Sequence, residues 1–352
     1  MSASSSAPVR VALDAMGGDK APAETVLGAV QAAREYNIGV YLVGREDSIK
    51  AELAKHDTSG LDLPIIHTDE VIEMDDHPAN AVRMKKNASM TLALQQVRDG
   101  HALGAVSAGN SGAMMAASLF TLKRLPGVSR PALGGVFPTK SGVCLVIDIG
   151  ANTDCKPEYL QQFALMGSIY MERIFHISSP RIGLLANGEE ETKGNQLVIE
   201  THQLLNTSST TLGLNFIGNV EGRDIPTGSV DVVVCDGFVG NIVLKLSEGL
   251  SETLIGLIRE QMTSTPLSKL AAAILRPGLR KVFKRLDYAE YGGVPLLGID
   301  GSAIVSHGRS NAKAIKNALR VARQTQETGV ATAIAEGLAK LKNIESKKQA
   351  EV

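Results

Sequence analysis

The chain has 352 residues, of which 44% are hydrophobic and 21% are charged, and its formal net charge is −1 at pH 7. It is long enough to bury a large core, as one domain or as two. The near-neutral charge, the absence of Trp and the presence of only seven Phe and six Tyr argue against nucleic-acid binding. The sequence has no run of about 18 apolar residues, so it predicts no membrane-spanning helix.

The N-terminus and the cysteines indicate a cytoplasmic protein. Residues 1–8 are rich in Ser and Ala and lack the apolar core of a signal peptide, so we expect a loose N-terminal tail. Cys144, Cys155 and Cys235 are odd in number and have no CxxC spacing. Because two of them stand in apolar runs, we expect buried thiols in a reducing compartment and not metal ligands or nucleophiles.

Strand-like apolar runs alternate with helical patterns along the chain. The strand-like runs cover residues 10–14, 40–43, 64–67, 105–107, 142–148, 181–185, 215–216 and 231–235. The clearest helical patterns cover residues 23–36, 90–99, 114–122, 158–174 and 242–262. This alternation predicts βαβ units and an α/β fold with a mostly parallel sheet.

Polar residues and glycines follow many of these strands. In residues 232–245 a β-branched run ends at Asp236, and Asn241 stands where an apolar helix begins. A strand buried on both faces leaves room for polar groups only at its end, where parallel sheets bind ligands. Several such turns on one sheet edge would form one cleft. The candidate ligand-binding residues are Asp14, Gly17, Gly18, Asn110, Ser111, Asn152, Asp236 and His307.

Each candidate also has an ordinary structural explanation. Asn110 and Ser111 begin a helix, so they could donate to phosphate or simply cap that helix. Lys193 follows three glutamates, and it could meet a phosphate or an oxyanion, or lie at a surface helix start. Asn241 could donate to a substrate or serve as an N-cap. His307, beside a glycine, could transfer protons or lie in a turn.

Residues 264–286 depart from the pattern because they are basic and contain no acidic residue. Apolar residues recur there at steps of three and four, which predicts two short amphipathic helices around Pro277 and Gly278. Such helices could dock on an anionic membrane or an acidic protein, or pack on the body or on a second subunit. The cations are Lys269, Arg276, Arg280, Lys281, Lys284 and Arg285.

Common signatures of other enzyme classes are missing. The chain has no GxGxxG, no Walker motif, no GxSxG elbow and no HExxH, and its seven histidines show no metal-ligand spacing. What remains is a set of neutral donors and glycines at helix starts, which suits a phosphate.

Seven motifs, in order along the chain, resemble the bacterial phosphate acyltransferase family PlsX. They are VALDAMGGD (11–19), SAGNSGA (107–113), IDIGAN (147–152), TKGN (192–195), FIGNVEGRD (216–224), DGFVGN (236–241) and YGGVPLLG (291–298). The resemblance extends from about residue 9 to the last helix.

This resemblance implies a homodimeric, Rossmann-like three-layer α/β/α sandwich with a mostly parallel sheet. It implies one domain over residues 9–345, with basic helices projecting at about 262–290, and a C-terminal tail over 346–352. The implied reaction converts long-chain acyl-acyl-carrier-protein and inorganic phosphate to acyl phosphate and free carrier, in phospholipid synthesis. The implied location is cytoplasmic, with peripheral contact to an anionic membrane and an acyl-phosphate-using glycerol-phosphate acyltransferase downstream.

The resemblance assigns catalysis to Lys193 and Asn241, and carrier or membrane docking to the basic segment. Phosphate is already a nucleophile and a thioester is already activated, so no metal, cofactor or covalent intermediate is expected. The three glutamates at 189–191 depart from the family pattern and give Lys193 an acid-rich approach.

Three alternatives remain at this stage. The first is a phosphotransacetylase-like enzyme that uses a free coenzyme A thioester. The second is a metal- and nicotinamide-dependent decarboxylating dehydrogenase, which shares a related architecture but requires clustered aspartates. The third is a non-catalytic membrane-surface scaffold. Release of free carrier thiol from acyl carrier protein in the presence of phosphate would separate them.

Overall fold

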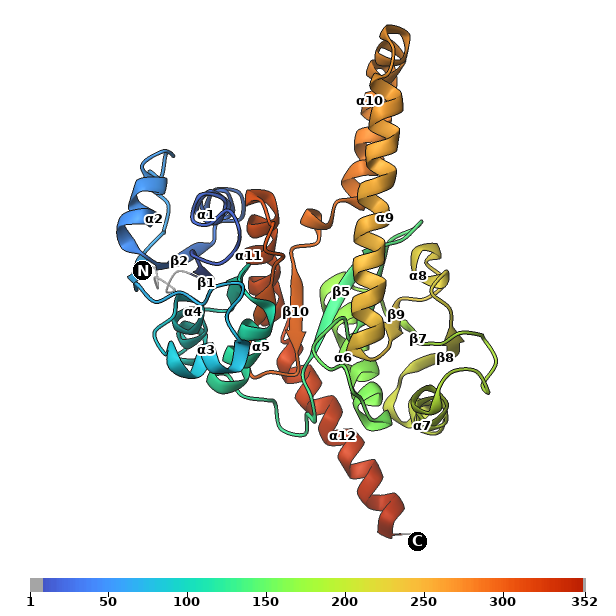
Figure 1. The fold of residues 1–352 in the computed structure, drawn as a ribbon. Helices are drawn as coiled ribbons and strands as arrows, with labels where there is room; N and C mark the ends of the chain where they lie inside the picture. Colours follow the sequence, from blue (N-terminus) through green and yellow to red (C-terminus); the bar gives the residue numbers. More distant parts are fainter. Residues whose placement is uncertain (1–8, 351–352) are drawn as a thin grey trace, which may run out of the picture.

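The computed structural model describes residues 9–350 and contains an 11-stranded sheet (Figure 1). The strand order is β3-β2-β1-β4-β11-β10-β5-β6-β9-β7-β8. The strands are β1 (Arg10–Asp14), β2 (Gly39–Gly44), β3 (Ile65–His67), β4 (Ala105–Ser107), β5 (Ala132–Pro138), β6 (Val143–Ile147), β7 (Arg181–Leu185), β8 (Asn215–Val220), β9 (Val232–Val234), β10 (Val294–Leu297) and β11 (Ala303–Val305).

Helices lie along both faces of this sheet. They are α1 (Ala23–Tyr36), α2 (Glu46–Leu53), α3 (Pro78–Met84), α4 (Ser89–Arg98), α5 (Ser111–Thr121), α6 (Pro157–Phe175), α7 (Gln196–Leu212), α8 (Asp224–Thr227), α9 (Gly237–Thr263), α10 (Pro266–Leu286), α11 (Ala312–Glu327) and α12 (Val330–Ala350), with a short 3-10 helix η1 (Tyr288–Glu290). Helix α12 continues through residues 346–350, where a tail was expected, and the expected tail at 1–8 lies outside the described residues.

Alternating side chains divide the core into two layers of packing. In β1, Val11 and Leu13 pack with α1 and α11, whereas Ala12 packs with α4 and α5. In β6, Leu145 packs with α6 and α7, and Val146 lies in the cluster that α9 covers. Because successive residues of a strand point to opposite faces, this alternation places helices on both sides. The predicted three-layer α/β/α fold is confirmed.

The two halves of the sheet run in opposite directions. The pairs β10–β11, β10–β5 and β5–β6 are antiparallel, and the other neighbouring strands are parallel. These three reversals make β6, β9, β7 and β8 antiparallel to β11, β4, β1, β2 and β3. The sequence did not predict β5, β10 or β11, because β5 contains two glycines, β10 contains a proline and β11 has only three residues.

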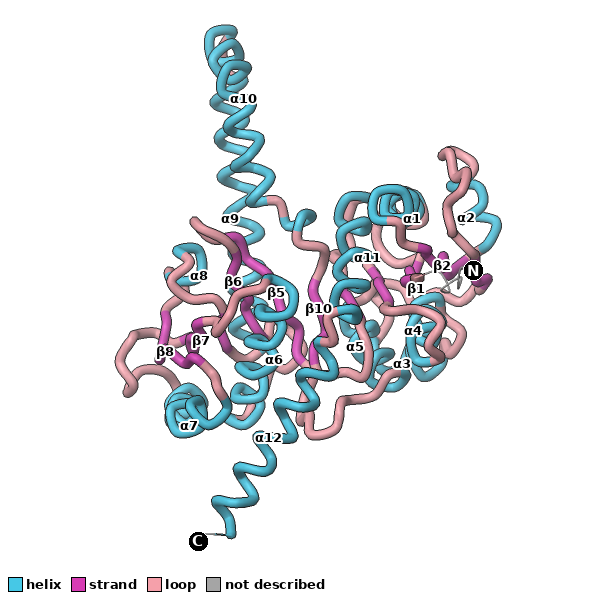
Figure 2. Tube along the Cα trace, turned by 180° about the vertical axis from the view of Figure 1, so that it is seen from behind, coloured by secondary structure: helices cyan, strands magenta, loops and turns pink. Residues whose placement is uncertain are grey.

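Helices α9 and α10 pack side by side and project from the sandwich as one arm (Figures 1 and 2). Helix α9 has 27 residues, which corresponds to about 40 Å of length. The prediction of two short helices in the basic segment is wrong, since α10 is one 21-residue helix with Pro277 inside it. Packing along α9 keeps the residues on both sides of Pro277 in line. Within residues 9–350 no helix is long and apolar enough to cross a membrane.

Candidate active site

The first turn of α9 lies directly on the end of β6. Asp236 caps the helix by accepting a hydrogen bond from the backbone N–H of Val239 at 2.9 Å. A Cβ on Gly240 would lie 1.9 Å from the backbone oxygen of Asp148, so only glycine permits this approach. Asn241 is exposed and faces the turn at Gly150. Since Asp236 is the cap, the capping explanation for Asn241 is wrong.

Asp148 and Asn152 build the turn on which Asn241 lies. The Asp148 carboxylate is fully buried and accepts hydrogen bonds from the backbone N–H groups of Leu133, Ala151 and Asn152. Burial raises the pKa of Asp148, while these donors act in the opposite direction. The side-chain amide of Asn152 donates to Asp148 and to the carbonyl of Pro131. Both amide hydrogens are therefore used within the protein, which leaves Asn152 a scaffolding role.

Lys193 lies in the turn that follows β7. Its backbone N–H donates to the Glu190 carbonyl at 3.0 Å, and its alkyl stem lies over the buried Gly188. Glu189 pairs with Arg223 at 3.0 Å, and Glu191 lies 3.6 Å from His202. None of the described acidic residues forms an ion pair with the Lys193 ammonium. None of the three glutamates that precede Lys193 forms a direct ion pair with it, while the Glu190 carboxylate lies close to the Lys193 stem above Gly188.

Strand order brings Lys193 and Asn241 to one edge of the sheet. The strands that precede them, β7 and β9, are parallel neighbours. Their carboxyl ends consequently lie side by side, with β6 and Asp148 next to β9. An exposed ammonium, an exposed amide and the N-terminus of a long helix lie at this edge. Such a set favours negative charge on a ligand or on a developing oxyanion.

The other candidate residues lie at the ends of β1, β4 and β11. Asp14 is buried and accepts a hydrogen bond from the Ser107 hydroxyl at 2.7 Å, and burial raises its pKa. A Cβ on Gly17 would lie 2.6 Å from an Asp14 carboxylate oxygen, and Gly18 has a φ of 109°. Both glycines are thus required by the turn itself.

Asn110 has no side-chain donor left for a ligand. Its Oδ1 accepts from the backbone N–H of Ala113, which caps α5 and leaves Ser111 exposed at the first helical position. Its Nδ2 donates to the carbonyls of Met74 and Asp76, both at 3.0 Å. The side chain of Asn110 therefore has a structural role, whereas the free groups at this turn belong to Ser111 and the backbone.

The expectation of one cleft along one sheet edge is wrong. Because the halves of the sheet run in opposite directions, the turns after β1, β4 and β11 lie at one edge and those after β6, β7 and β9 at the other. Asp14, Gly17, Gly18, Asn110 and Ser111 do not share an edge with Lys193 and Asn241. The unpredicted strands β5 and β10 cause this separation.

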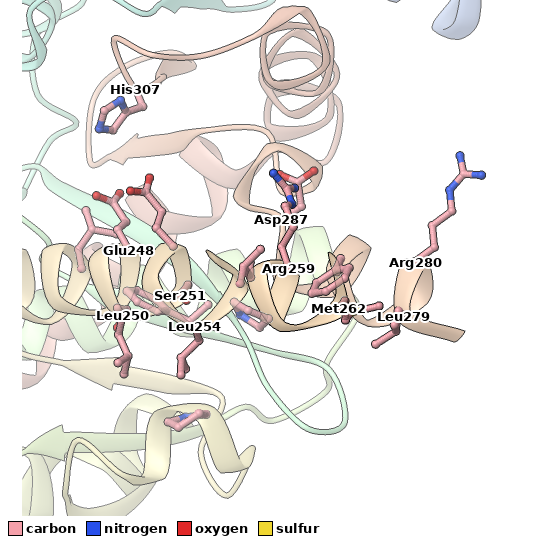
Figure 3. A pocket seen from close by; sticks show the side chains of 18 of the residues that line it. Glu248, Leu250, Ser251, Leu254, Arg259, Met262, Leu279, Arg280, Asp287 and His307 are labelled. Atoms are coloured by element: carbon pink, nitrogen blue, oxygen red, sulfur yellow. The ribbon is translucent and has the colours of Figure 1, made fainter. Parts of the chain in front are cut away.

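A groove of about 1310 Å³ runs along the arm. Val243 and Leu244 of α9 line it within one turn of Asn241. His307, which follows β11, lines it near Glu248 of α9 (Figure 3). Figure 3 shows Glu248 pointing to the side of α9 on which His307 lies, with Leu250 and Leu254 on the opposite side. The remaining lining comes mainly from β5, α8 and α10. The groove therefore connects the surroundings of Asn241 with the end of β11.

The six cations of the basic segment occupy different positions. Lys269, Arg276 and Arg280 line the groove. Lys284 lies 3.8 Å from Glu290, and Arg285 donates to the carbonyl of Lys140 at 2.9 Å. Lys281 is exposed. The first three are available to a ligand, whereas Lys284 and Arg285 fasten the arm to the body.

Helix α9 carries an apolar stripe that was not among the expectations from sequence. Phe238, Ile242, Leu246, Leu250 and Leu254 recur every four residues, and each is between 50% and 67% exposed. That spacing puts them on one face of the helix, and it can be seen in the sequence. A helix that is this apolar on its outer face requires a partner surface.

The cysteines and the acidic residues offer little other chemistry. Cys144 and Cys235 are buried, as predicted, and Cys155 is half-buried. Burial raises the pKa of all three thiols, to about 12 for Cys155, so all are protonated at neutral pH. Among residues 9–350, no three His, Cys, Asp or Glu side chains are grouped so that they could hold a metal.

Comparisons with known proteins agree with this architecture. The chain matches the family described as "Fatty acid synthesis protein" over residues 9–333, and it belongs to that family. A phosphate acyltransferase of Pelotomaculum thermopropionicum is 52% identical over 91% of this chain and 92% of the relative. One from Geobacter sulfurreducens is 53% identical over 93% of this chain and 94% of the relative. The predicted membership of the phosphate acyltransferase family is thus confirmed.

Solved structures show the same fold at low identity. The EutD phosphotransacetylase of Staphylococcus aureus has a TM-score of 0.60 and 17% identity, covering 91% of this chain and 94% of its own. A 4-hydroxythreonine-4-phosphate dehydrogenase of Klebsiella pneumoniae has a TM-score of 0.51 and 13% identity, covering 94% of this chain and 100% of its own. At these identities the likeness concerns the fold alone.

We predict that Gly240→Ala lowers the free energy of unfolding by about 3 kcal/mol or more, because its methyl group would overlap the Asp148 backbone. Gly249→Ala is the matched control in the same helix, where a Cβ meets no atom within 4 Å. That variant should gain up to about 1 kcal/mol from helix propensity. Denaturant titration measures both values, and equal effects would contradict the proposed close packing.

Proposed function

We propose that this protein transfers a long-chain acyl group from acyl carrier protein to inorganic phosphate, which yields acyl phosphate and free carrier for phospholipid synthesis. The observation that carries the proposal is the groove along α9, whose lining reaches Val243 and Leu244 within one turn of Asn241. At about 1310 Å³ it is larger than the ~300–1,000 Å³ typical of small-molecule pockets. Its apolar side chains suit a hydrocarbon chain. Membership of a family whose relatives are named phosphate acyltransferase supports the reaction type.

The chemistry requires that two anionic partners meet at one carbonyl. A phosphate oxygen attacks the thioester carbon, the carbonyl oxygen becomes a tetrahedral oxyanion, and collapse breaks the C–S bond and releases the carrier thiolate. We assign oxyanion and phosphate stabilisation to Lys193 and Asn241, next to the α9 N-terminus. Asn152 and Asp236 shape the turns around this pair, whereas Asp14, Gly17, Gly18 and Asn110 shape turns at the opposite edge of the sheet. Ser111 and His307, at that opposite edge, remain candidate substrate contacts.

We predict that Lys193→Ala lowers turnover by roughly 100-fold or more, because a preorganised cation at the oxyanion is lost. The assay follows phosphate-dependent release of free thiol from acyl carrier protein, and acyl coenzyme A serves as the alternative donor. Lys55→Ala, which removes an exposed lysine that is distant in sequence from Lys193, is the control and should keep normal turnover. Normal turnover of Lys193→Ala would remove this lysine from the mechanism, and no thiol release by the unaltered protein would reject the proposed reaction.

Asn241 and Asp236 can be separated by their effects on stability. We predict that Asn241→Ala lowers turnover by about 100-fold and leaves the free energy of unfolding unchanged, because its exposed amide caps nothing. Asp236→Ala should lower stability by about 1 kcal/mol through loss of the cap. Thermal unfolding and thiol release on both variants provide the test. A stability loss in Asn241→Ala as large as that in Asp236→Ala would assign Asn241 a structural role.

The arm offers surfaces for the other proposed partners. Lys269, Arg276 and Arg280 around the groove suit an acidic carrier protein. Leu270 and Ile274 on α10 are more than 60% exposed beside these cations, as expected for peripheral contact with an anionic membrane. We assign Phe238, Ile242 and Leu246 of the α9 stripe, which do not line the groove, to a homodimer contact. In this proposal the protein is cytoplasmic, and a glycerol-phosphate acyltransferase that uses acyl phosphate consumes the product.

We predict that reversing Arg276 and Arg280 to Glu raises KM for the acyl-carrier substrate by about tenfold, because two attractive charges become repulsive. The same acyl group on pantetheine should keep its KM, since it lacks the acidic carrier. Reversal of Arg98, which pairs with Asp99 on the exposed side of α4, is the control.

The membrane contact is tested on the same arm. Replacement of Leu270 and Ile274 by Ser should reduce pelleting with anionic vesicles and leave carrier kinetics unchanged. An unchanged KM after charge reversal would place the carrier elsewhere. Conversion of the Ser variant to a monomer in sedimentation would assign these residues to the dimer and not to the membrane.

A further inference from the structure

A β-bulge in β8 turns Asn219 toward the helix that follows Lys193. Ile182 pairs with Phe216 and Leu184 pairs with Asn219, so two steps along β7 correspond to three steps along β8. The extra residue puts Phe216 and Asn219 on the same face of the sheet, because side chains alternate along a regular strand. Gly218 lies in this segment with a φ of 97°, a conformation that favours glycine.

Asn219 bridges α7 and the Lys193 turn. Its Nδ2 donates to the backbone carbonyl of Glu190 at 2.8 Å, and its Oδ1 lies 2.9 Å from Nδ1 of His202. Because the Glu190 carbonyl can only accept, it fixes the orientation of the amide. The Oδ1 then requires a proton on His202 Nδ1. Both side chains are buried, with 6% exposure for Asn219 and 5% for His202.

His202 is itself held on its remaining sides. Its ring lies edge-on to Phe216 with centroids 5.4 Å apart. Its Nε2 lies 3.6 Å from the Glu191 carboxylate, beyond direct hydrogen-bond distance. His202 and Asn219 therefore form a fixed pair, and this pair contacts the Lys193 turn through the Glu190 carbonyl.

The Glu190 carbonyl also accepts the backbone N–H of Lys193 at 3.0 Å. One carbonyl oxygen thus joins the buried amide of Asn219 to the turn that carries the ammonium. We infer that Asn219, oriented by His202 and by the bulge at Gly218, is a positioning residue that holds the Lys193 turn in its catalytic position. This inference rests on the proposed role of Lys193.

The test compares Asn219→Asp with Asn215→Asp. Asp at position 219 can still accept from His202, but it removes the donor to Glu190 and sets a carboxylate against a carbonyl. Asn215, on the same strand, donates to the Ser179 carbonyl at 3.1 Å on the exposed surface, so its replacement removes a similar bond away from the turn. We expect kcat of Asn219→Asp to fall roughly 10- to 100-fold with KM nearly unchanged, because a small displacement of a catalytic group suffices for such a loss. Asn215→Asp should keep normal kcat.

A double mutant tests whether Asn219 acts through Lys193. If it does, Asn219→Asp should cause no further loss in the Lys193→Ala background. If the two substitutions lower kcat independently, so that their effects multiply, the inference is overturned. It is also overturned if Lys193→Ala lowers kcat while Asn219→Asp keeps a normal kcat. If Asn219→Asp does not fold, two variants of His202 provide the test. His202→Phe keeps an aromatic ring but lacks the donor to Asn219, so it should lower kcat. His202→Asn keeps a donor, so its kcat should be close to that of the unaltered protein. Equal activity of those two variants would also overturn the inference.

Trypsin cleavage after Lys193 gives a readout that does not depend on catalysis. A turn freed from Asn219 should be cut faster in Asn219→Asp than in Asn215→Asp, as followed by mass spectrometry. Unchanged cleavage would mean that Asn219 does not hold the turn, which overturns the inference while leaving the proposed function intact. Faster cleavage of Asn219→Asp together with a normal kcat of Lys193→Ala would mean that the turn is held but has no catalytic role, which also overturns the inference. Only a lack of thiol release by the unaltered protein would reject the proposed function.

Discussion

The contact between the first turn of α9 and the end of β6 determines where the candidate active site lies. Because Gly240 has no side chain, the helix backbone lies on the carbonyl of Asp148. This contact sets Asn241 over the Gly150 turn and directs the remaining turns of α9 along the groove. The buried carboxylate of Asp148, held by backbone donors, makes the surface on which the helix lies rigid. Asn241 and the α9 side of the groove consequently belong to one helix, whereas Lys193 comes from the turn after β7.

The parallel parts of the sheet could be predicted from the sequence, and the reversals could not. Runs such as 231–235 are β-branched, buried on both faces and followed by polar turns, so they have a clear pattern. The strands β5 and β10 contain Gly or Pro, and tertiary pairing alone makes them strands. Their omission had a functional consequence, because it merged two sheet edges into one expected cleft. The resemblance to a family gave the fold class correctly without giving this geometry.

The same limit applies to individual site residues. Lys193 and Asn241 could be selected from motifs and chemistry, since both follow strands that the sequence identified. Asn110 and Asn152 looked equivalent in sequence, yet their amide groups bind carbonyls of residues 74, 76 and 131. Which polar side chain remains free depends on segments more than 20 residues away, and no local pattern contains that information. Asn219 was likewise hidden, because a one-residue bulge decides which face of β8 it occupies.

Charge is distributed locally in a chain whose net charge is only −1. Glu189 pairs with Arg223 and Glu191 lies beside His202, whereas the Glu190 carboxylate remains close to the Lys193 stem. The groove is lined by cations from three elements, namely Lys269, Arg276 and Arg280 of α10, Arg259 of α9, and Arg309 after β11. Exposed charges farther apart than about 10 Å are screened from each other at 0.1 M ionic strength. The attraction that Lys193 or a groove cation exerts on a ligand charge is therefore local to its own position, and Val243 and Leu244 bring apolar lining within one turn of Asn241. In the proposed substrate the thioester carbonyl stands between the carrier and the hydrocarbon chain, so a carbonyl placed at Lys193 and Asn241 leaves the apolar side chains of the groove to the hydrocarbon chain.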